Sequence, residues 1–304
     1  MKSIRWILPL VAVLMAAVSC GPKAKAPKVL VLYYSQTSNT KTVAEAIQDK
    51  LGADIEEIVP VVPYDGDFQA TIERSGRERN EGVLPEIEPL KVDVADYDII
   101  FLGYPIWFGT YAPPVGALLE KVDLSGKKVV PFCTFGSGGL FSSIEDLKKK
   151  CPDAEILPGY GVRAARISAV PKEVENFLKA GGFIEGEAIQ LEDFPEPHPA
   201  TEEEAAIFAA AVSDYPMMTN AVASTATSRV IPGGVEYLFT AVTAPANPDG
   251  LKGPGAPDGP KGPGAPGGFK APAGDRPNLP PPGDMKVYVT VEDGQAPVFT
   301  QVLR

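Results

Sequence analysis

Hydrophobic and polar residues alternate in blocks between residues 28 and 180, and the blocks predict strands followed by helices. Continuous apolar runs, typical of buried strands in a parallel sheet, occupy residues 29–34, 98–103 and 128–134. Further strands are expected at 54–59 and 154–158, and helices at 41–51, 115–122, 140–150 and 171–180. This alternation predicts a doubly wound α/β domain with a parallel sheet over residues 28–182.

The pattern changes after residue 182 and predicts a second, smaller unit. An acidic, proline-containing linker is expected at 183–200, followed by a helix that begins with a capping box at Thr201 and Glu204. Alternating residues then predict antiparallel strands at 224–231, 235–242, 285–291 and 298–303. Residues 244–283 are rich in Pro and Gly and are expected to be a disordered insert. The resulting small α+β module, 201–304, faintly resembles the cystatin fold.

The first residues resemble a bacterial lipoprotein signal. Lys2 and Arg5 precede an apolar stretch at 7–18, which is short for a membrane span, and small residues lead to Cys20. The resemblance implies a signal peptide at 1–20, lipidation of Cys20 and a tether at 21–27 that holds the protein on a membrane of the bacterial cell envelope. The alternatives are a plain secretory signal or an uncleaved anchor.

Charge and cysteine content narrow the function classes. A formal net charge of -11 argues against nucleic acid as the main partner. Cys133 and Cys151 are expected to be structural, and no metal-ligating cluster is expected. His198, the single histidine, lies between two prolines and is expected to be a linker residue rather than a catalyst.

A polar turn after the first predicted strand is the first part of a candidate site. It holds only hydroxyl and amide side chains, namely Ser35, Gln36, Thr37, Ser38, Asn39 and Thr40. A strand, a polar turn and a helix direct backbone N–H groups and the positive end of the helix dipole toward one spot, where an anion binds well. The hydroxyls could add donors for a phosphate. The alternative is an ordinary turn whose Ser and Thr residues cap the helix.

Two further turns follow the third and fourth predicted strands. The second contains Pro105, Ile106, Trp107, Phe108 and Gly109; the third contains Thr134, Phe135, Gly136, Ser137, Gly138 and Gly139. Aromatic faces suit stacking on a flat heteroaromatic ligand, and glycine lets the backbone approach a ring edge. Taken singly, such a tryptophan is more often a core residue and such a turn an ordinary loop. Since open α/β sheets bind ligands at the carboxyl ends of their strands, the three turns together predict one site.

These turns resemble the three cofactor loops of the flavodoxin family. Ser35, Thr37 and Thr40 fit the phosphate-loop pattern T/S-x-T-G-x-T, whereas Ser38 stands where glycine is usual. Trp107 corresponds to the aromatic residue against the isoalloxazine ring, and residues 134–139 resemble the loop at its pyrimidine edge. The resemblance covers about half of the chain. It implies a five-stranded sheet in the order 2-1-3-4-5 and flavin mononucleotide (FMN) as the cofactor.

The resemblance implies electron transfer by a bound flavin, to a redox partner protein or a small-molecule acceptor. A G-x-G-x-x-G nucleotide motif is absent after the first predicted strand, so an NAD(P)H-dependent oxidoreductase would need direct hydride delivery to the flavin. The alternative from another class is a flavin-free, lipid-anchored binding protein that recognises a partner through its C-terminal module.

Overall fold

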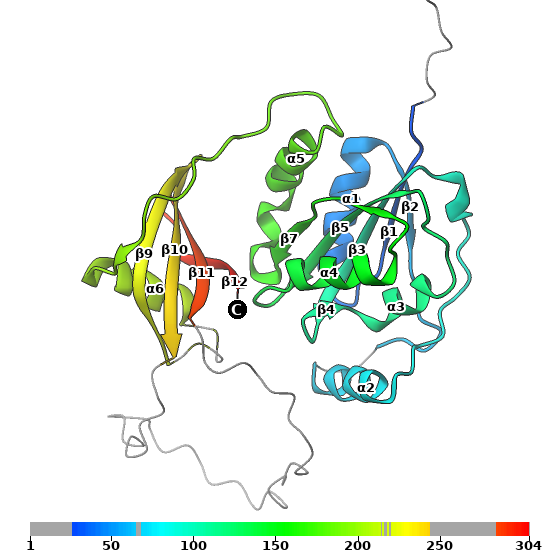
Figure 1. The fold of residues 1–304 in the computed structure, drawn as a ribbon, viewed down its shortest axis with the longest axis horizontal. Helices are drawn as coiled ribbons and strands as arrows, with labels where there is room; N and C mark the ends of the chain where they lie inside the picture. Colours follow the sequence, from blue (N-terminus) through cyan, green and yellow to red (C-terminus); the bar gives the residue numbers. More distant parts are fainter. Residues whose placement is uncertain are drawn as a thin grey trace, which may run out of the picture.

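A computed structural model describes residues 26–64, 68–213, 215, 218, 220–243 and 284–303. It contains a mainly parallel sheet in the N-terminal half and an antiparallel sheet in the C-terminal half (Figure 1). The expected signal peptide with Cys20, most of the tether and the insert at 244–283 lie outside the described residues. None of the helices in the described ranges combines the length and the apolar character needed to cross a bilayer.

The N-terminal sheet has the predicted strand order. Its strands are β1 Val29–Tyr33, β2 Asp54–Glu57, β3 Ile99–Trp107, β4 Thr110–Tyr111, β5 Lys128–Phe135, β6 Glu155–Ile156 and β7 Tyr160–Arg163. Its helices are α1 Asn39–Leu51, α2 Phe68–Glu81, α3 Pro113–Leu119, α4 Leu140–Lys150 and α5 Val170–Ala180, with 3-10 turns η1 Val94–Asp96 and η2 Ala164–Ala169. The parallel strands run β2-β1-β3-β5-β6, with β7 also paired to β5 and β4 forming a hairpin on β3. The order 2-1-3-4-5 is therefore confirmed.

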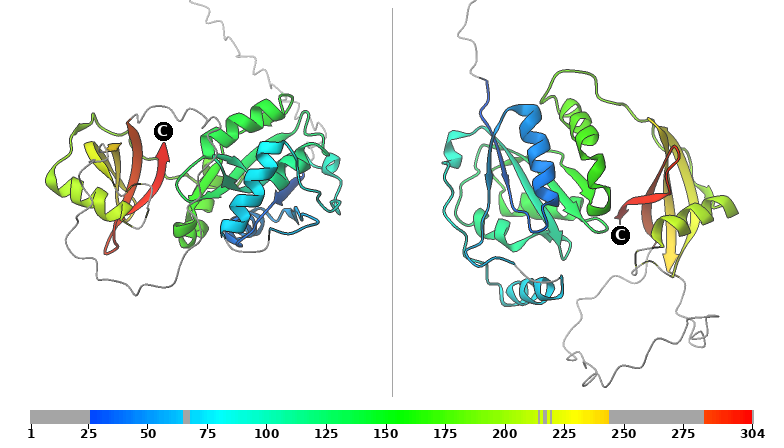
Figure 2. Two further views of the ribbon diagram at one scale, coloured as in Figure 1. Left: turned by 90° about the horizontal axis from the view of Figure 1, so that it is seen from below. Right: turned by 180° about the vertical axis from the view of Figure 1, so that it is seen from behind.

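Helices cover both faces of this sheet because successive strand residues point to opposite sides. On one face Val31 packs in a cluster with Ile47 of α1 and Leu178 of α5. On the other face Leu32 packs in a cluster with Leu118 of α3. The view from behind in Figure 2 shows α1 and α5 side by side across the first face. The near-continuous burial of β1, β3 and β5 follows from this double cover.

The fifth parallel strand is interrupted, which the sequence did not predict. β5 pairs with β6 at residues 128 and 129 and with β7 at residues 132 to 135, so the ladder breaks beside Pro131. Proline has no N–H to donate to a neighbouring strand. Gly159 lies in the gap, where a Cβ would come within 2.6 Å of the Pro131 carbonyl oxygen. The expected strand at 154–158 therefore includes only β6, and β7 extends the sheet toward the third turn.

The C-terminal module combines one helix with a five-stranded sheet in the order β12-β11-β10-β9-β8. Its elements are β8 His198–Pro199, α6 Glu202–Val212, β9 Ala221–Ile231, β10 Gly234–Thr243, β11 Met285–Glu292 and β12 Val298–Leu303. The capping box at Thr201 and Glu204 is confirmed, with both reciprocal hydrogen bonds formed. The short strand β8 belongs to the segment 183–200 that the sequence assigns to the linker. The cystatin-like resemblance stays a prediction.

Candidate functional site

The three predicted turns lie at the carboxyl edge of the parallel sheet, where β1, β3 and β5 end (Figure 1). Side-chain contacts connect them. The hydroxyls of Thr40 and Thr134 are 2.8 Å apart and link the first turn to the third. The rings of Tyr34, the residue immediately before the first turn, and Trp107 of the second turn are 5.8 Å apart between centroids. Ser142 of α4, just after the third turn, donates to the Gly109 carbonyl of the second (2.6 Å). The fold thus brings together what the chain separates by about a hundred residues.

The first turn leaves the start of helix α1 uncapped. Ser38 occupies the N-cap position in the left-handed conformation, with φ 65°, and its side chain forms no cap hydrogen bond. The first turn of the helix contains no acidic residue. The opening N–H groups of a helix have no intrahelical acceptor, so an uncapped start retains donors and a partial positive charge for an anion. The alternative of side-chain capping by Ser38 is not what the structure shows.

A buried hydroxyl without a partner lies just before this helix. Ser35 Oγ is enclosed and has no hydrogen-bond partner in the described part of the chain. Ser35 also lines a cavity of about 290 Å³ together with Tyr34 and Tyr64. A buried hydroxyl that stays unpaired costs free energy, about 1–3 kcal/mol by mutational estimates. The Ser35 hydroxyl is therefore available to donate a hydrogen bond to a bound ligand.

The other side chains of the first turn are divided between the interior and the surface. Gln36 Nε2 donates to the Tyr64 carbonyl (3.0 Å) and to Thr71 Oγ1 (2.6 Å), so its amide fastens the turn to α2. Asn39 Nδ2 donates to Thr37 Oγ1 (3.2 Å) at the surface. Gln36 thus has a structural role, while the Thr37 hydroxyl keeps its own proton for a ligand.

Trp107 in the second turn is held in an aromatic cluster. Its ring meets Tyr64 at 5.0 Å and Tyr34 at 5.8 Å between centroids, both edge to face. Trp107 is half-buried, so part of its indole is still accessible. Sequence reasoning missed Tyr34 and Tyr64 as members of this cluster. Tyr34 reads as the end of a buried strand, and Tyr64 lies in a stretch without periodicity, so neither carries a signal of its own.

The remainder of the second turn is a tight hairpin between β3 and β4. Phe108 and Gly109 are its two central residues, and both have positive φ, 51° and 82°. Two positive values at the centre characterise a type I′ turn. Phe108 is 43% exposed and lies against the Arg79 guanidinium of α2, 5.5 Å from the ring centroid. Pro105, by contrast, is part of β3 and pairs in register with Thr134.

The glycines of the third turn have different reasons to be glycine. A Cβ at Gly139 would lie 2.6 Å from Ile106 Cγ2, and φ there is 114°. A Cβ at Gly138 would lie 2.6 Å from the carbonyl oxygen of Val302, in the C-terminal module. Gly136 alone of the three faces open space. Close packing explains Gly138 and Gly139 without a ligand, while Gly136 is where a ring edge could approach.

The phenols around the site stay protonated. Burial is the main cause that raises the pKa of Tyr34, although the Arg74 cation acts in the opposite direction. Burial also raises the pKa of Tyr64, and its hydrogen bond to the Glu78 carboxylate raises it further. Arg74 lies 3.8 Å from the Tyr64 ring centroid and 2.9 Å from Glu78 Oε1. The phenols of Tyr34 and Tyr64 therefore stay neutral near physiological pH, and the Arg74–Glu78 ion pair of α2 lies next to Tyr64.

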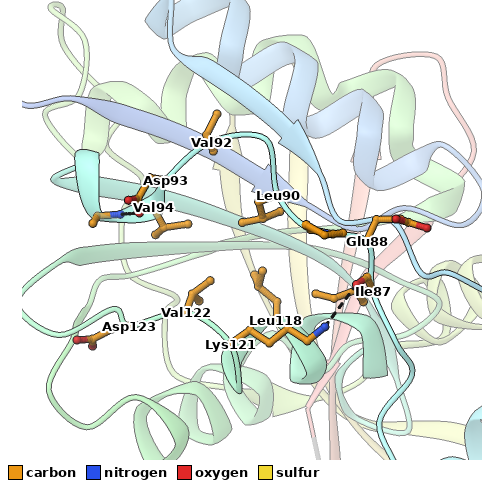
Figure 3. A pocket seen from close by; sticks show the side chains of 12 residues that line it. Ile87, Glu88, Leu90, Val92, Asp93, Val94, Leu118, Lys121, Val122 and Asp123 are labelled. Carbon is orange, nitrogen blue, oxygen red and sulfur yellow. Dashed lines mark hydrogen bonds between the residues drawn. The ribbon is translucent and has the colours of Figure 1, made fainter.

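A separate cavity of about 360 Å³ lies between the segment before β3 and the end of α3 (Figure 3). Leu90, Val94, Leu118 and Val122 give it an apolar wall, and Lys121 Nζ donates to the Ile87 carbonyl (3.4 Å) at its edge. The cavity shares no residue with the three turns and has no aromatic residue in its lining. It lacks the faces that a flat heteroaromatic ligand needs.

Comparison with known proteins agrees with this geometry. The family model described as flavodoxin matches residues 28–177. A candidate flavoprotein from Bacteroides eggerthii is 32% identical over 49% of this chain and 96% of its own, with a TM-score of 0.43. Residues 28–177 belong to the flavodoxin family. A flavoprotein from Lactobacillus acidophilus, solved in complex with FMN, is 26% identical over 48% of this chain and 98% of its own (TM-score 0.42).

Membership also gives meaning to the departure at Ser38. The family pattern has glycine at this position, and glycine takes positive φ without strain. Ser38 takes the same left-handed conformation that the pattern anticipates. The flavodoxin loop shape is therefore kept, at the local cost of a side chain in an unfavourable backbone region. The family model ends at residue 177, so the C-terminal module lies outside it.

Proposed function

We propose that this protein is an FMN-binding electron-transfer protein of the flavodoxin type. Family membership supports FMN as the cofactor, and the observation that carries the proposal is the unpartnered, buried hydroxyl of Ser35 beside the uncapped start of α1. A phosphate supplies the acceptor that this hydroxyl lacks and the negative charge that the helix start favours. Thr37 and Thr40 would add further hydroxyl donors.

The remaining turns would hold the ring system. Trp107, steadied by Tyr34 and Tyr64, offers a face or edge for the isoalloxazine, and Gly136 offers open backbone at the third turn. Bound FMN supplies one- and two-electron redox chemistry. The chain's own contribution is to bind the phosphate, orient the ring and exclude water from it. A carrier that passes electrons to a partner protein and an NAD(P)H-dependent oxidoreductase both use this arrangement.

Titration with two flavins tests the proposal. The fluorescence of FMN should be quenched when FMN is mixed with the purified protein. Riboflavin, which lacks the phosphate, should bind much more weakly. Ser35→Ala removes one hydrogen bond to a charged group, worth about 1.5–3 kcal/mol, so FMN affinity should fall about tenfold or more while riboflavin binding is unchanged. Ser125→Ala, an exposed serine just before β5 at the opposite end of the strand, is the matched control. Wild-type protein that binds neither flavin would support the flavin-free binding protein instead.

The proposed location is the cell envelope, with the protein held on a membrane by lipid at Cys20. The support is the sequence alone, namely the apolar stretch ending in small residues before Cys20. Replacing Cys20 with Ala should release the protein from the membrane fraction of cells that express it. Identical fractionation of the variant and the wild type would contradict a lipid anchor.

A further inference from the structure

The C-terminal module is joined to the third turn by one direct hydrogen bond and by a second link that passes through Arg163. The Val302 N–H of β12 donates to the Ser137 carbonyl (2.7 Å). Arg163, at the end of β7, donates from Nε to the Gly136 carbonyl (2.7 Å) and from Nη1 to the Phe299 carbonyl of β12 (3.0 Å). The carbonyls of Gly136 and Ser137, which are successive in the third turn, thus accept hydrogen bonds from Arg163 and from the module respectively.

Arg163 is the centre of this contact. It is 7% exposed, and its guanidinium lies 3.3 Å from the centroid of the Phe299 ring, which is itself fully buried in the core of the module. A planar guanidinium can donate in two directions at once while it stacks on an aromatic face, and lysine cannot do this. Arg163 therefore connects the flavin loop with the interior of the module rather than with its surface.

The edge of the C-terminal sheet is shaped for this contact. β12 is an edge strand. Phe299 and Val302 are three residues apart, so in a regular strand the backbone N–H and C=O groups of one would point away from β11 and those of the other toward it. The register between β12 and β11 shifts between Phe299 and Gln301, leaving Thr300 as the extra residue of a bulge. The bulge places the Phe299 carbonyl and the Val302 N–H on the same outer edge. The missing side chain of Gly138 lets that edge come close.

We propose that the C-terminal module is a clamp on the third flavin loop, with Arg163 as the positioning residue between them. This inference rests on the proposed binding of FMN. A loop held by the docked module needs less ordering when the flavin arrives, so docking raises FMN affinity. By linkage, bound FMN stabilises docking by the same factor.

The amide of Val302 reports on docking directly. Its hydrogen bond is to Ser137, whereas the neighbouring Gln301, in register with Tyr288, points its N–H toward β11 because N–H groups alternate along a strand. Hydrogen exchange measured by NMR should show Val302 protected in the wild type and further protected when FMN is added. Gln301 is the internal control and should change little with FMN.

Two variants test the clamp through FMN affinity. Val302→Pro removes the outward N–H of an edge strand, together with the valine side chain, and should weaken FMN binding about fivefold. Val302→Ala shortens the side chain but keeps the N–H, and should bind FMN as the wild type does. Arg163→Met should weaken FMN binding at least about tenfold and expose the Val302 amide to exchange. Arg163→Lys keeps the positive charge but lacks the planar guanidinium with its divergent N–H donors, so it should restore FMN affinity and Val302 amide protection only in part.

The outcomes separate the clamp from the proposed function. The clamp would be overturned if Val302→Pro and Arg163→Met bound FMN as tightly as the wild type and if exchange of the wild-type Val302 amide did not change with FMN. The proposed FMN binding would then still stand. Wild-type protein that binds no FMN would overturn the proposed function, and with it the coupling to FMN. Docking itself would then be decided by the Val302 amide, whose protection in the wild type and loss in Arg163→Met would still establish the contact.

Discussion

The hydroxyl pair between Thr40 and Thr134 makes a quantitative prediction about how the site is held together. The two side chains are 1% and 4% exposed, and their oxygens are 2.8 Å apart. Thr40→Val alone leaves the Thr134 hydroxyl buried without its partner, and Thr134→Val does the same to Thr40. Each single change should lower the free energy of unfolding by about 1–2 kcal/mol, within the range for a buried unsatisfied hydroxyl. The double change removes both hydroxyls together and should cost less than either single change.

Urea unfolding of the FMN-free protein measures these values. Trp107 is the one tryptophan among the described residues, so its fluorescence follows the flavodoxin domain rather than the C-terminal module. The double-mutant cycle formed by the two single changes and the double change should give a coupling free energy of about 1–3 kcal/mol between Thr40 and Thr134. A change of about 1 kcal/mol should shift the melting temperature by about 2–4 °C for a domain of this size. Additive single changes, or single changes without effect, would refute a direct hydroxyl contact and show that water reaches both groups.

Three other predictions concern single positions. Ser38→Gly should stabilise the domain by up to about 1 kcal/mol in urea unfolding, because relief of the left-handed strain outweighs the added freedom of glycine in the unfolded chain. Trp107→Ala should destabilise it by about 2–3 kcal/mol and weaken FMN binding, and Trp107→Phe should recover part of both because it keeps a ring against the tyrosines. Among the described residues, burial raises the pKa of two free thiols, those of Cys133, which is completely enclosed, and Cys151, which is only partly enclosed. Iodoacetamide at pH 8 should therefore label Cys151 first and Cys133 only after unfolding, and equal labelling of the two would contradict the packing of β5.

The order of the parallel strands could be predicted because double cover by helices leaves a strong trace in sequence. β1, β3 and β5 are buried on both faces, and their apolar runs are continuous. The fifth strand could not be delimited, because its break depends on Pro131 in the neighbouring strand. A residue's missing N–H affects whichever strand lies beside it, and sequence order does not tell which strand that is.

The three turns could be located from sequence, but the interior partners of the site could not. Hydroxyls and glycines mark a turn locally, whereas Tyr64 joins Trp107 only because a non-periodic segment folds back over the sheet edge. Arg163 is the last residue of the short strand β7, and nothing in the neighbouring sequence marks it as buried. Its burial depends on Phe299, which is 136 residues away in the chain. Long-range contacts of this kind carry no periodic signal.

The contact between β12 and the third turn also offsets two features that would each be unfavourable alone, namely an open strand edge and a glycine-rich loop. The outer edge of β12 carries unpaired N–H and C=O groups, and an open edge of that kind invites pairing with other chains. A glycine-rich loop at a ligand site has many conformations to lose on binding. The contact of Phe299 and Val302 with the third turn covers the edge and restricts the loop in the same step. The module therefore restricts the third turn, and the third turn covers the open edge of β12, so each half of the chain supplies what the other lacks.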